Sequence, residues 1–568
     1  MGVGIVEPTA THVPGTVRLF DDDNENNNNE EGGHPQRKTR ALKHGTGKYS
    51  HVVLVPQPSD SPNDPLNWPK WKRNLTLLVV CLAGAVAGVI GPAIAPITGI
   101  LVKEFETTYT EVAIWSGWQF WSAGIAGLLS SVVGRIWGKR PVYLISIALV
   151  FAGAIWNSRT TTAGGFRAAR LVQGFGLGAF ESIIPSTVGD LFYVHERGKR
   201  IAFYNLAFLG CTYFMPILGG YISMKHSWRT QFIIISCFMG PILVLAFFLL
   251  PEHAYNRPQI FDTDTGSREN LDRLEEHIAG KEEEEEEVEE KKGRTADVEP
   301  VVAEKKKTWI QELKIYNGRF SDENIFKCLL APFVLMLYPA TIWSFFFQGT
   351  FITWGIGVSI ILAQLFAGPP TNFGPEQLGY MYSAPFLGAV LSYLTATYLS
   401  DNLAQWMARR NHNIYEPEFR ILLVIPTTIF AIPGLFAFGY SSAPEHYIHW
   451  IIPSICYGLL TFAVVMSCTA TFSYILDAHR DVSLEMMIAL LMMKNFWAWG
   501  STYFLNDWVV AHGPEKMFYI IGAIQTVICA SSVAMYVYGK VVRDYYARNN
   551  WLKMAGLYPK TVVDVSGH

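Results

Sequence analysis

The sequence KEEEEEEVEEKK at residues 281–292 lies at the centre of a polar stretch, residues 251–324, that decides how the chain is organised. Six long apolar segments precede this stretch and six follow it. Each has about the 20 residues that a helix needs to cross a bilayer. The polar stretch itself cannot bury enough apolar surface to fold alone. The sequence therefore predicts an all-α membrane protein with twelve transmembrane helices in two six-helix bundles.

The apolar segments give the predicted boundaries. In the first half the spans cover residues 74–98, 112–135, 141–158, 167–190, 200–223 and 229–250, and in the second half 338–366, 377–399, 420–440, 449–476, 486–508 and 516–538. We accordingly predict a disordered N-terminal tail (1–73), a first bundle (74–250), an acidic linker with a pre-helix segment (251–337), a second bundle (338–538) and a C-terminal tail (539–568).

Composition excludes several classes of protein. Only 16% of the residues are charged, whereas soluble proteins average about 25%. No basic stripe indicates a nucleic-acid partner. The seven cysteines show no CxxC spacing, which argues against a disulfide framework or a zinc site. Without a P-loop, a metal-binding cluster or a nucleophile constellation, we expect no cofactor, no metal and no enzyme activity.

Lysine and arginine in short loops predict the orientation, because they favour the cytoplasmic side. One set of loops carries Lys139, Arg140, Lys199, Arg200 and Arg410, whereas loops 367–375 and 441–448 contain neither lysine nor arginine. We therefore expect both termini and the linker in the cytoplasm, and a multi-pass protein of the plasma membrane.

Polar side chains inside the predicted spans indicate a cavity, because each is costly in a bilayer without a partner or water. The fourth span carries Arg170, Gln173 and Glu181. Arg170 and Glu181 are eleven residues apart, which at about 100° per residue returns to nearly the same helix face. We expect this stripe to line a central cavity, where Glu181 can take up a proton because burial disfavours its charged form. In the alternative interpretation, Glu181 only hydrogen-bonds neighbouring helices.

Five further polar residues are candidates for the substrate or proton pathway. Lys494 and Asn495 lie in the eleventh span. Lys494 either lines the cavity, pairs with a carboxylate, or extends toward the membrane surface. The uncharged candidates are Gln119, Asn205 and Gln348.

One glycine-rich motif has a structural explanation. Residues 174–179 (GFGLGA) match the dinucleotide-binding pattern G-x-G-x-x-A. That pattern binds phosphate only where a strand turns into a helix. Because it lies here within an apolar helix, it predicts close packing between helices.

Several other motifs resemble those of a known family: DPLNWP at 64–69, RLVQG at 170–174, DLFYVHERG at 190–198, PILGG at 216–220, and Ser400-Asp401 with Arg409-Arg410. With them, the chain resembles fungal members of the major facilitator superfamily, in their twelve-span drug:proton antiporter branch. The resemblance runs from about residue 56 to 545, omitting the linker.

The resemblance implies alternating access between the bundles around a midplane site. It assigns Arg170 to proton coupling and Glu181 to binding a proton or cation. Conformational roles fall to Arg135, Gly138, Lys139, Arg140, Asp401, Arg409, Pro216, Gly219 and Gly220. Two positions depart from the family pattern, since Arg135 stands where an acid is usual and Met215 where glycine is usual.

The leading hypothesis is a monomeric, proton-coupled transporter that exports a small hydrophobic compound, such as a drug or secondary metabolite, with protons and the lipid bilayer as its other partners. Uptake or exchange of a small organic cation such as a polyamine is an alternative. A nutrient sensor that signals through the acidic linker without moving solute is another.

Overall fold

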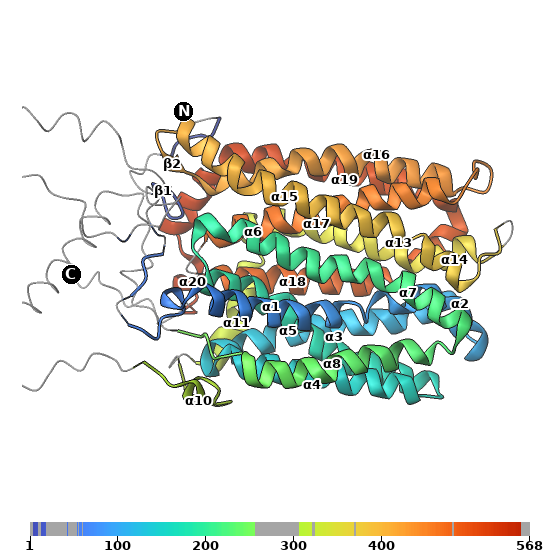
Figure 1. Ribbon diagram of the computed structural model, residues 1–568. Coiled ribbons are helices and arrows are strands. Elements are labelled where there is room, and N and C mark those ends of the chain that lie inside the picture. The colour runs from blue at the N-terminus through green and yellow to red at the C-terminus, as the bar shows by residue number, and fades with distance from the viewer. Residues whose placement is uncertain are drawn as a thin grey trace, which may run out of the picture.

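The computed structural model describes residues 4–8, 13–18, 43, 54, 56–59, 61–255, 306–320, 324–368, 371–479 and 482–557. Within them, the chain forms two groups of long helices that run side by side (Figure 1). The acidic run at 281–292 lies outside the described residues.

The first bundle contains six helical segments, and each coincides with one predicted span. They are α1 with η4 and α2 (Lys70–Gly88, Pro92–Ile97, Thr98–Glu104), α3 (Tyr109–Trp137), α4 (Lys139–Arg159), α5 (Ala163–Leu191), α6 with η5 and α7 (Val194–Asn205, Leu206–Gly210, Cys211–Lys225), and α8 (Arg229–Leu249). The first segment is interrupted because Pro92 and Pro96 have no amide hydrogen to donate.

The second bundle also contains six segments. They are α12 with η7 and α13 (Pro339–Ser344, Phe345–Gly349, Thr350–Phe366), α14 with α15 (Pro375–Tyr380, Ser383–Arg410), η8 with α16 (Pro417–Leu423, Val424–Ser442), α17 (Ile451–Ala478), α18 (Ser483–Ser501) and α19 (Leu505–Arg548). α18 ends at Ser501, seven residues before the predicted end of that span. The next helix begins at Leu505 and bends at Gly513, and the apolar pattern continues across this turn.

Several short helices and a pair of strands lie at one end of the bundles. They are η3 (Pro65–Asn67), α10 (Trp309–Glu312), α11 (Ile325–Leu335), α20 (Trp551–Met554) and the antiparallel strand pair β1 (Val17–Arg18) and β2 (Ile414–Tyr415). Residues 4–8 and 13–18 therefore have fixed places in the structure, which differs there from the prediction of a disordered tail. They are held by backbone pairing and by Ile5, which is buried.

The outer surface is suited to lipid. Among the described residues, eight helical segments are long and apolar enough to cross a membrane. Large apolar side chains such as Phe238, Leu387 and Val527 are exposed on it, and an apolar surface of this extent favours lipid over water. Four long helices, α3, α5, α15 and α18, are not among these eight. Within their predicted spans, α5 carries the charged residue Glu181 and α18 carries Lys494.

Small residues let α3 and α5 pack closely, as the glycine motif predicts. A Cβ at Gly174 would lie 2.0 Å from Ser122 Oγ, and one at Gly178 would lie 2.4 Å from the Ala123 carbonyl oxygen. The predicted packing role of this motif is confirmed.

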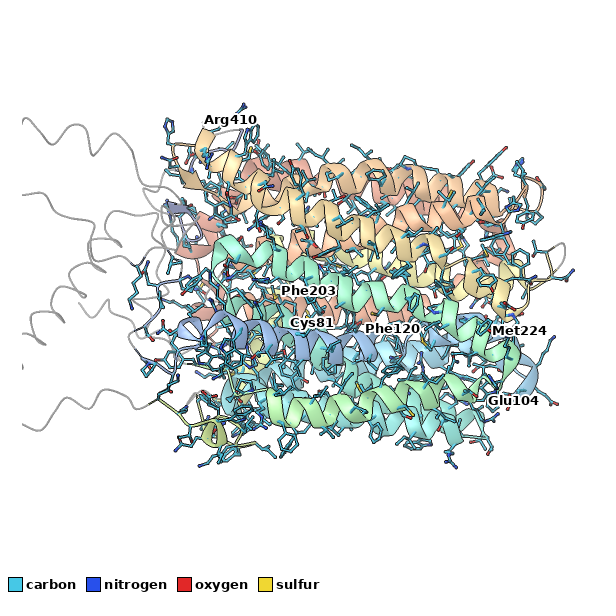
Figure 2. The ribbon with its side chains drawn as sticks, in the orientation of Figure 1. Cys81, Glu104, Phe120, Phe203, Met224 and Arg410 are labelled. Atoms are coloured by element: carbon cyan, nitrogen blue, oxygen red, sulfur yellow. The ribbon has the colours of Figure 1, made fainter. Side chains whose placement is uncertain are left out.

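The two ends of the molecule differ in charge. Figure 2 shows Arg410 at one end, Glu104 and Met224 at the other, and Phe120 between them. Strands β1 and β2 lie at the same end as Arg410 (Figure 1). Arg197 also lies there, because its partner Asp477 accepts a hydrogen bond from Tyr415 of β2. Arg135 lies at this end too, because it pairs with Glu485 in the first turn of α18, which follows closely in the chain. We call this the basic end, and the other the opposite end.

Candidate functional site

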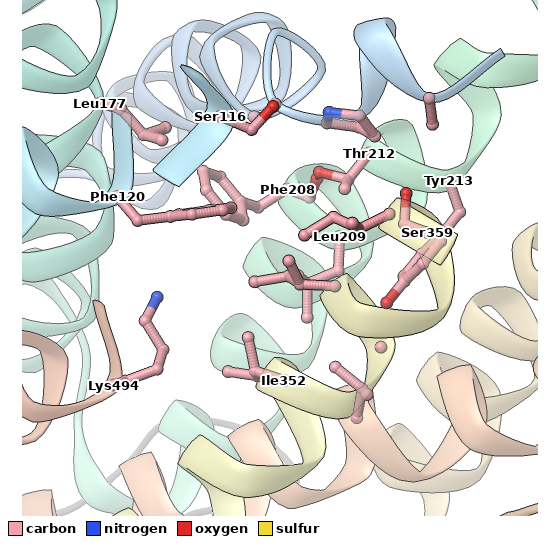
Figure 3. Close-up of a pocket in the computed structure, with 18 of the residues that line it drawn as sticks. Ser116, Phe120, Leu177, Phe208, Leu209, Thr212, Tyr213, Ile352, Ser359 and Lys494 are labelled. Carbon is pink, nitrogen blue, oxygen red and sulfur yellow. The ribbon is translucent and has the colours of Figure 1, made fainter. Parts of the chain in front are cut away.

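A cavity lies between the two bundles, lined by both halves of the chain (Figure 3). It contains about 1230 Å³ of space, some of it continuous with the outside. Most of the lining is aromatic or aliphatic, including Phe120, Leu177, Tyr204, Phe208, Leu209, Tyr213, Ile352, Tyr457, Val464, Phe472 and Leu491. Its apolar wall suits a small organic molecule.

Glu181 on α5 and Lys494 on α18 meet at the cavity wall. Lys494 Nζ lies 2.8 Å from Glu181 Oε2, and Asn495 Nδ2 donates to the same oxygen at 2.9 Å. Both charged side chains line the cavity, and Figure 3 shows Lys494 extending toward the space beneath Phe120. Because a buried charge is strongly destabilising without a partner, this contact links the first bundle to the second.

Asn205 and Gln348 also line the cavity and bind the same neighbouring helix. Asn205 Nδ2 donates to Thr469 Oγ1 at 2.9 Å, and Gln348 Oε1 accepts a hydrogen bond from Thr471 Oγ1. Both partners lie on α17. These two amides therefore connect α6 and η7 to the centre of the second bundle.

Arg170 lies behind the cavity wall rather than in its lining. Its guanidinium donates to the carbonyl oxygens of Ile90 at 2.7 Å and Gly91 at 3.2 Å. These carbonyls lie in the interruption between α1 and η4, where the regular helical hydrogen bonds are missing. The stripe predicted from the fourth span is therefore divided: Glu181 reaches the cavity, and Arg170 fixes the break in the first span.

Gln173 and Gln119 are fully buried and are not among the lining residues. Gln173 Oε1 accepts a 3.4 Å hydrogen bond from Arg170. Gln119 lies at the close contact between α3 and α5, next to Gly174. Their positions within the first bundle are those of packing residues.

At the basic end, Arg135 on α3 forms an ion pair with Glu485 on α18. A second ion pair across the bundles joins Arg197 Nη1 to Asp477 Oδ1 at 3.9 Å. The family resemblance marks Arg135 as a departure, and the structure supplies its acidic partner from the other bundle. Sequence reasoning missed Glu485 because it precedes the predicted start of that span by one residue.

The rest of the 135–140 loop is held within the first bundle. Lys139 forms an ion pair with Asp190 on α5. Glu252 accepts hydrogen bonds from the backbone amides of Lys139 and Arg140, each at 3.1 Å. A carboxylate at these first amides of α4 caps the helix and complements its dipole. Glu252, just beyond α8, is a second residue that the sequence did not reveal.

Gly138 cannot be replaced without strain. Its φ is +100° with ψ 159°, and a Cβ there would lie 2.2 Å from Glu252 Oε2. We expect Gly138→Ala to lower the free energy of unfolding by about 1–3 kcal/mol, measured as a lower thermal unfolding temperature in detergent. Gly513→Ala is the matched control, because Gly513 has φ 76° and ψ 160° but no atom within 4 Å of its Cβ position. Equal losses in the two variants would rule out the contact with Glu252 as the cause.

Asp401 belongs to a buried charge cluster in the second bundle. Arg420 Nη1 lies 3.0 Å from Asp401 Oδ1, and Arg420 Nε lies 3.3 Å from Asp477 Oδ2. A Cβ at Gly198 on α6 would lie 2.3 Å from Asp401 Oδ1, so the first bundle approaches this cluster directly. Arg409 is exposed in the last turn of α15.

Two histidines lie beside these charged groups: His253 is buried and His479 is half-buried. Burial lowers the pKa of His253, whose Nε2 lies 3.1 Å from Thr187 Oγ1. Burial, with a contribution from nearby Arg543, lowers the pKa of His479 to about 3. Both imidazoles are therefore neutral at physiological pH and add no positive charge to the basic end.

The motif at 216–220 lies toward the opposite end, where α7 contacts α14. A Cβ at Gly220 would lie 2.3 Å from the Pro375 carbonyl oxygen, and one at Gly379 would lie 2.7 Å from the Pro216 carbonyl oxygen. Gly219 faces Gln231 and Pro96 within the first bundle. Pro216 and Gly220 thus let backbones of the two bundles approach closely.

Comparison with known proteins identifies the family. The sequence pattern of the Major Facilitator Superfamily matches residues 76–498, which is more than half of the chain. The chain belongs to the Major Facilitator Superfamily. The predicted fold class, two bundles of six transmembrane helices, is thereby confirmed. The members it resembles are transporters rather than enzymes.

Several of its relatives in this superfamily are fungal. An uncharacterised MFS-type transporter of Schizosaccharomyces pombe is 26% identical over 88% of this chain and 90% of its own length. Protein HOL1 of Saccharomyces cerevisiae is 25% identical over 88% and 91%. The MFS antiporter QDR3 of Candida albicans is 20% identical over 89% and 83%.

Solved structures of the superfamily share the fold. The proton:xylose symporter XylE superposes with a TM-score of 0.53 at 15% identity, covering 82% of this chain and 96% of XylE. The human organic anion transporter MFSD10 superposes with a TM-score of 0.51 at 13% identity, covering 82% and 100%. At these identities the likeness extends to the fold alone.

Proposed function

We propose that this superfamily member is a proton-coupled secondary transporter that exports a small, largely apolar organic compound by alternating access. The observation that carries the proposal is the ion pair between Glu181 and Lys494, which lines the cavity and joins the bundles. Protonation of Glu181 removes the charge that holds Lys494 and so weakens a contact between the halves. A proton taken up there is thereby coupled to movement of one bundle against the other.

The apolar lining and the names of two relatives support the substrate class. Aromatic and aliphatic side chains dominate the wall, which favours a hydrophobic solute. Relatives include an antiporter of Candida albicans and the multidrug transporter TPO1_2 of Candida glabrata. We place the basic end in the cytoplasm of a plasma-membrane protein, following the lysine and arginine bias of its loops, and expect a single chain to suffice, because one chain lines the whole cavity.

A small organic cation is the second candidate cargo. Glu181 is a carboxylate within a wall that also contains Tyr204, Tyr213 and Tyr457, and aromatic faces together with a carboxylate attract organic cations. Such a cation would compete with Lys494 for Glu181. A sensor that signals through the acidic linker would depend on residues that lie outside those described.

Flux in proteoliposomes tests the proposal. We expect the purified protein to move candidate hydrophobic solutes when a pH gradient is imposed, and a protonophore to stop this movement. A panel of organic cations distinguishes the two cargo classes. Absence of gradient-driven flux for both classes would contradict the transporter proposal and favour the sensor.

A further inference from the structure

Residues 4–8 and 13–18, which we call the N-terminal segment, lie on the second bundle although the chain next enters the first. Strand β1 pairs with β2, with Val17 opposite Tyr415 and Arg18 opposite Ile414. The amide of Val6 donates to the Val537 carbonyl oxygen of α19 at 3.0 Å. The segment thus lies at the basic end of the second bundle, which comes later in the sequence.

An apolar side chain anchors the segment. Ile5 is only 1% exposed and packs in a cluster with Met407, Tyr415 and Phe419. An isoleucine buried to this degree is removed from water almost completely, which favours the docked position.

Polar contacts fix the register of the same segment. Thr16 Oγ1 donates to Glu416 Oε2 at 2.8 Å. Lys540 Nζ lies 2.6 Å from Glu7 Oε2, and Arg543 donates to the Pro14 carbonyl oxygen. The segment therefore adds partners to a buried charge cluster, formed by Glu416 before η8 and by Lys540 and Arg543 of α19, whose members also pair with one another.

The segment also contacts Asp477, one of the residues through which the bundles meet. Gly15 has φ +90°, and a Cβ there would lie 2.9 Å from the Asp477 carbonyl oxygen. Tyr415, paired with Val17, donates through its hydroxyl to Asp477 Oδ2 at 2.6 Å. Asp477 in turn faces Arg197 of the first bundle. Two contacts therefore connect the N-terminal segment to an ion pair between the bundles.

We propose that the N-terminal segment is an intramolecular strap that stabilises closure of the basic end. It does so by holding Tyr415 and Asp477 where Asp477 meets Arg197. The effect acts through these contacts between the N-terminal segment and the second bundle. Undocking of the strap favours opening of the basic end. The proposal holds for any cargo and for any coupling ion.

Distances between spin labels test the strap in the purified full-length protein. Labels on cysteines replacing Lys199 of the first bundle and Arg410 of the second, both exposed, report separation of the basic ends. Cys211 and Cys237, which are not fully buried, are first replaced by serine. In this labelled protein we then introduce Gly15→Ala, Ile5→Asp or deletion of residues 1–18. Each variant is compared with the labelled protein that has an intact N-terminal segment.

We expect the population with the longer distance to rise about fivefold relative to the shorter one, the effect of losing roughly one net hydrogen bond. Gly318→Ala is the control, because Gly318 has φ +85° and no atom within 4 Å of its Cβ position. Unchanged distances in Ile5→Asp and in the shortened chain would overturn the proposal. So would an equal shift in Gly318→Ala, since the effect would then not depend on docking.

Discussion

Glu181→Gln should abolish proton-driven flux while leaving exchange of solute across the membrane intact. Glutamine keeps the shape of the side chain and still accepts hydrogen bonds from Lys494 and Asn495, but it cannot take up a proton. Flux under an imposed pH gradient should therefore fall to the level seen without a gradient. Counterflow of labelled solute, which needs no proton, should persist.

The unpaired lysine complicates this variant, so a second one is needed. Glu181→Gln leaves the Lys494 charge in a buried site, at a cost of about 3–5 kcal/mol. In Glu181→Gln with Lys494→Met, stability should recover while proton coupling stays lost. Glu111→Gln, the same change at an exposed position in the first turn of α3, should behave as the parent. Normal coupling in the Glu181 variants would remove this carboxylate from the mechanism.

Arg135→Glu should block the transport cycle, and exchanging both charges should restore it. The variant places two carboxylates opposite each other, because Arg135 faces Glu485 across the bundles. Breaking a largely buried pair costs about 3–5 kcal/mol, enough to shift the equilibrium between open and closed basic ends by roughly two to four orders of magnitude. Solute flux measures the block of the transport cycle. Labelling of a cysteine placed at the basic end measures how far that end has opened.

The double variant Arg135→Glu with Glu485→Arg recreates the pair with reversed polarity. We expect flux and labelling to return toward those of the parent, which in a double-mutant cycle appears as a coupling energy well above zero. Lys139→Gln is the control, because it removes a nearby cation whose acidic partner, Asp190, lies in the same bundle. It should shift the balance between open and closed basic ends less than Arg135→Glu does. Additive effects of the two single changes would show that Arg135 and Glu485 act independently.

Helix positions could be predicted from sequence because each depends on a local property. A run of apolar residues long enough to cross the bilayer forms a helix whatever its neighbours do, so all twelve segments coincide with helices. Several helices extend beyond the predicted apolar spans, as α15 and α19 do. Only at residues 501–508 does a predicted span run past the end of its helix by several residues, because apolar residues continue there through a turn. Hydropathy records the environment of a residue and not its backbone direction, so this helix end was invisible to it.

The site was predicted only in part, since the sequence gives helix faces and not which faces meet. It indicated Glu181 and Lys494 as polar residues that need partners, and left open whether they pair. It placed Arg170 beside Glu181 by helical period, whereas the Arg170 guanidinium turns to the carbonyls of Ile90 and Gly91. The break between α1 and η4 leaves free carbonyl oxygens that accept hydrogen bonds from Arg170. The sequence of α5 alone gives no sign of that break.

By itself, therefore, the sequence determined that the chain crosses a bilayer in two sets of six helices, because burial of apolar side chains in lipid is a property of each segment alone. Only the tertiary structure decided which charges neutralise each other: Glu181 with Lys494, Arg135 with Glu485, and Asp477 with Arg197. The partners in these pairs are 280 or more residues apart. Their pairing depends on how the two bundles face each other, and electrostatic attraction acts through space rather than along the chain.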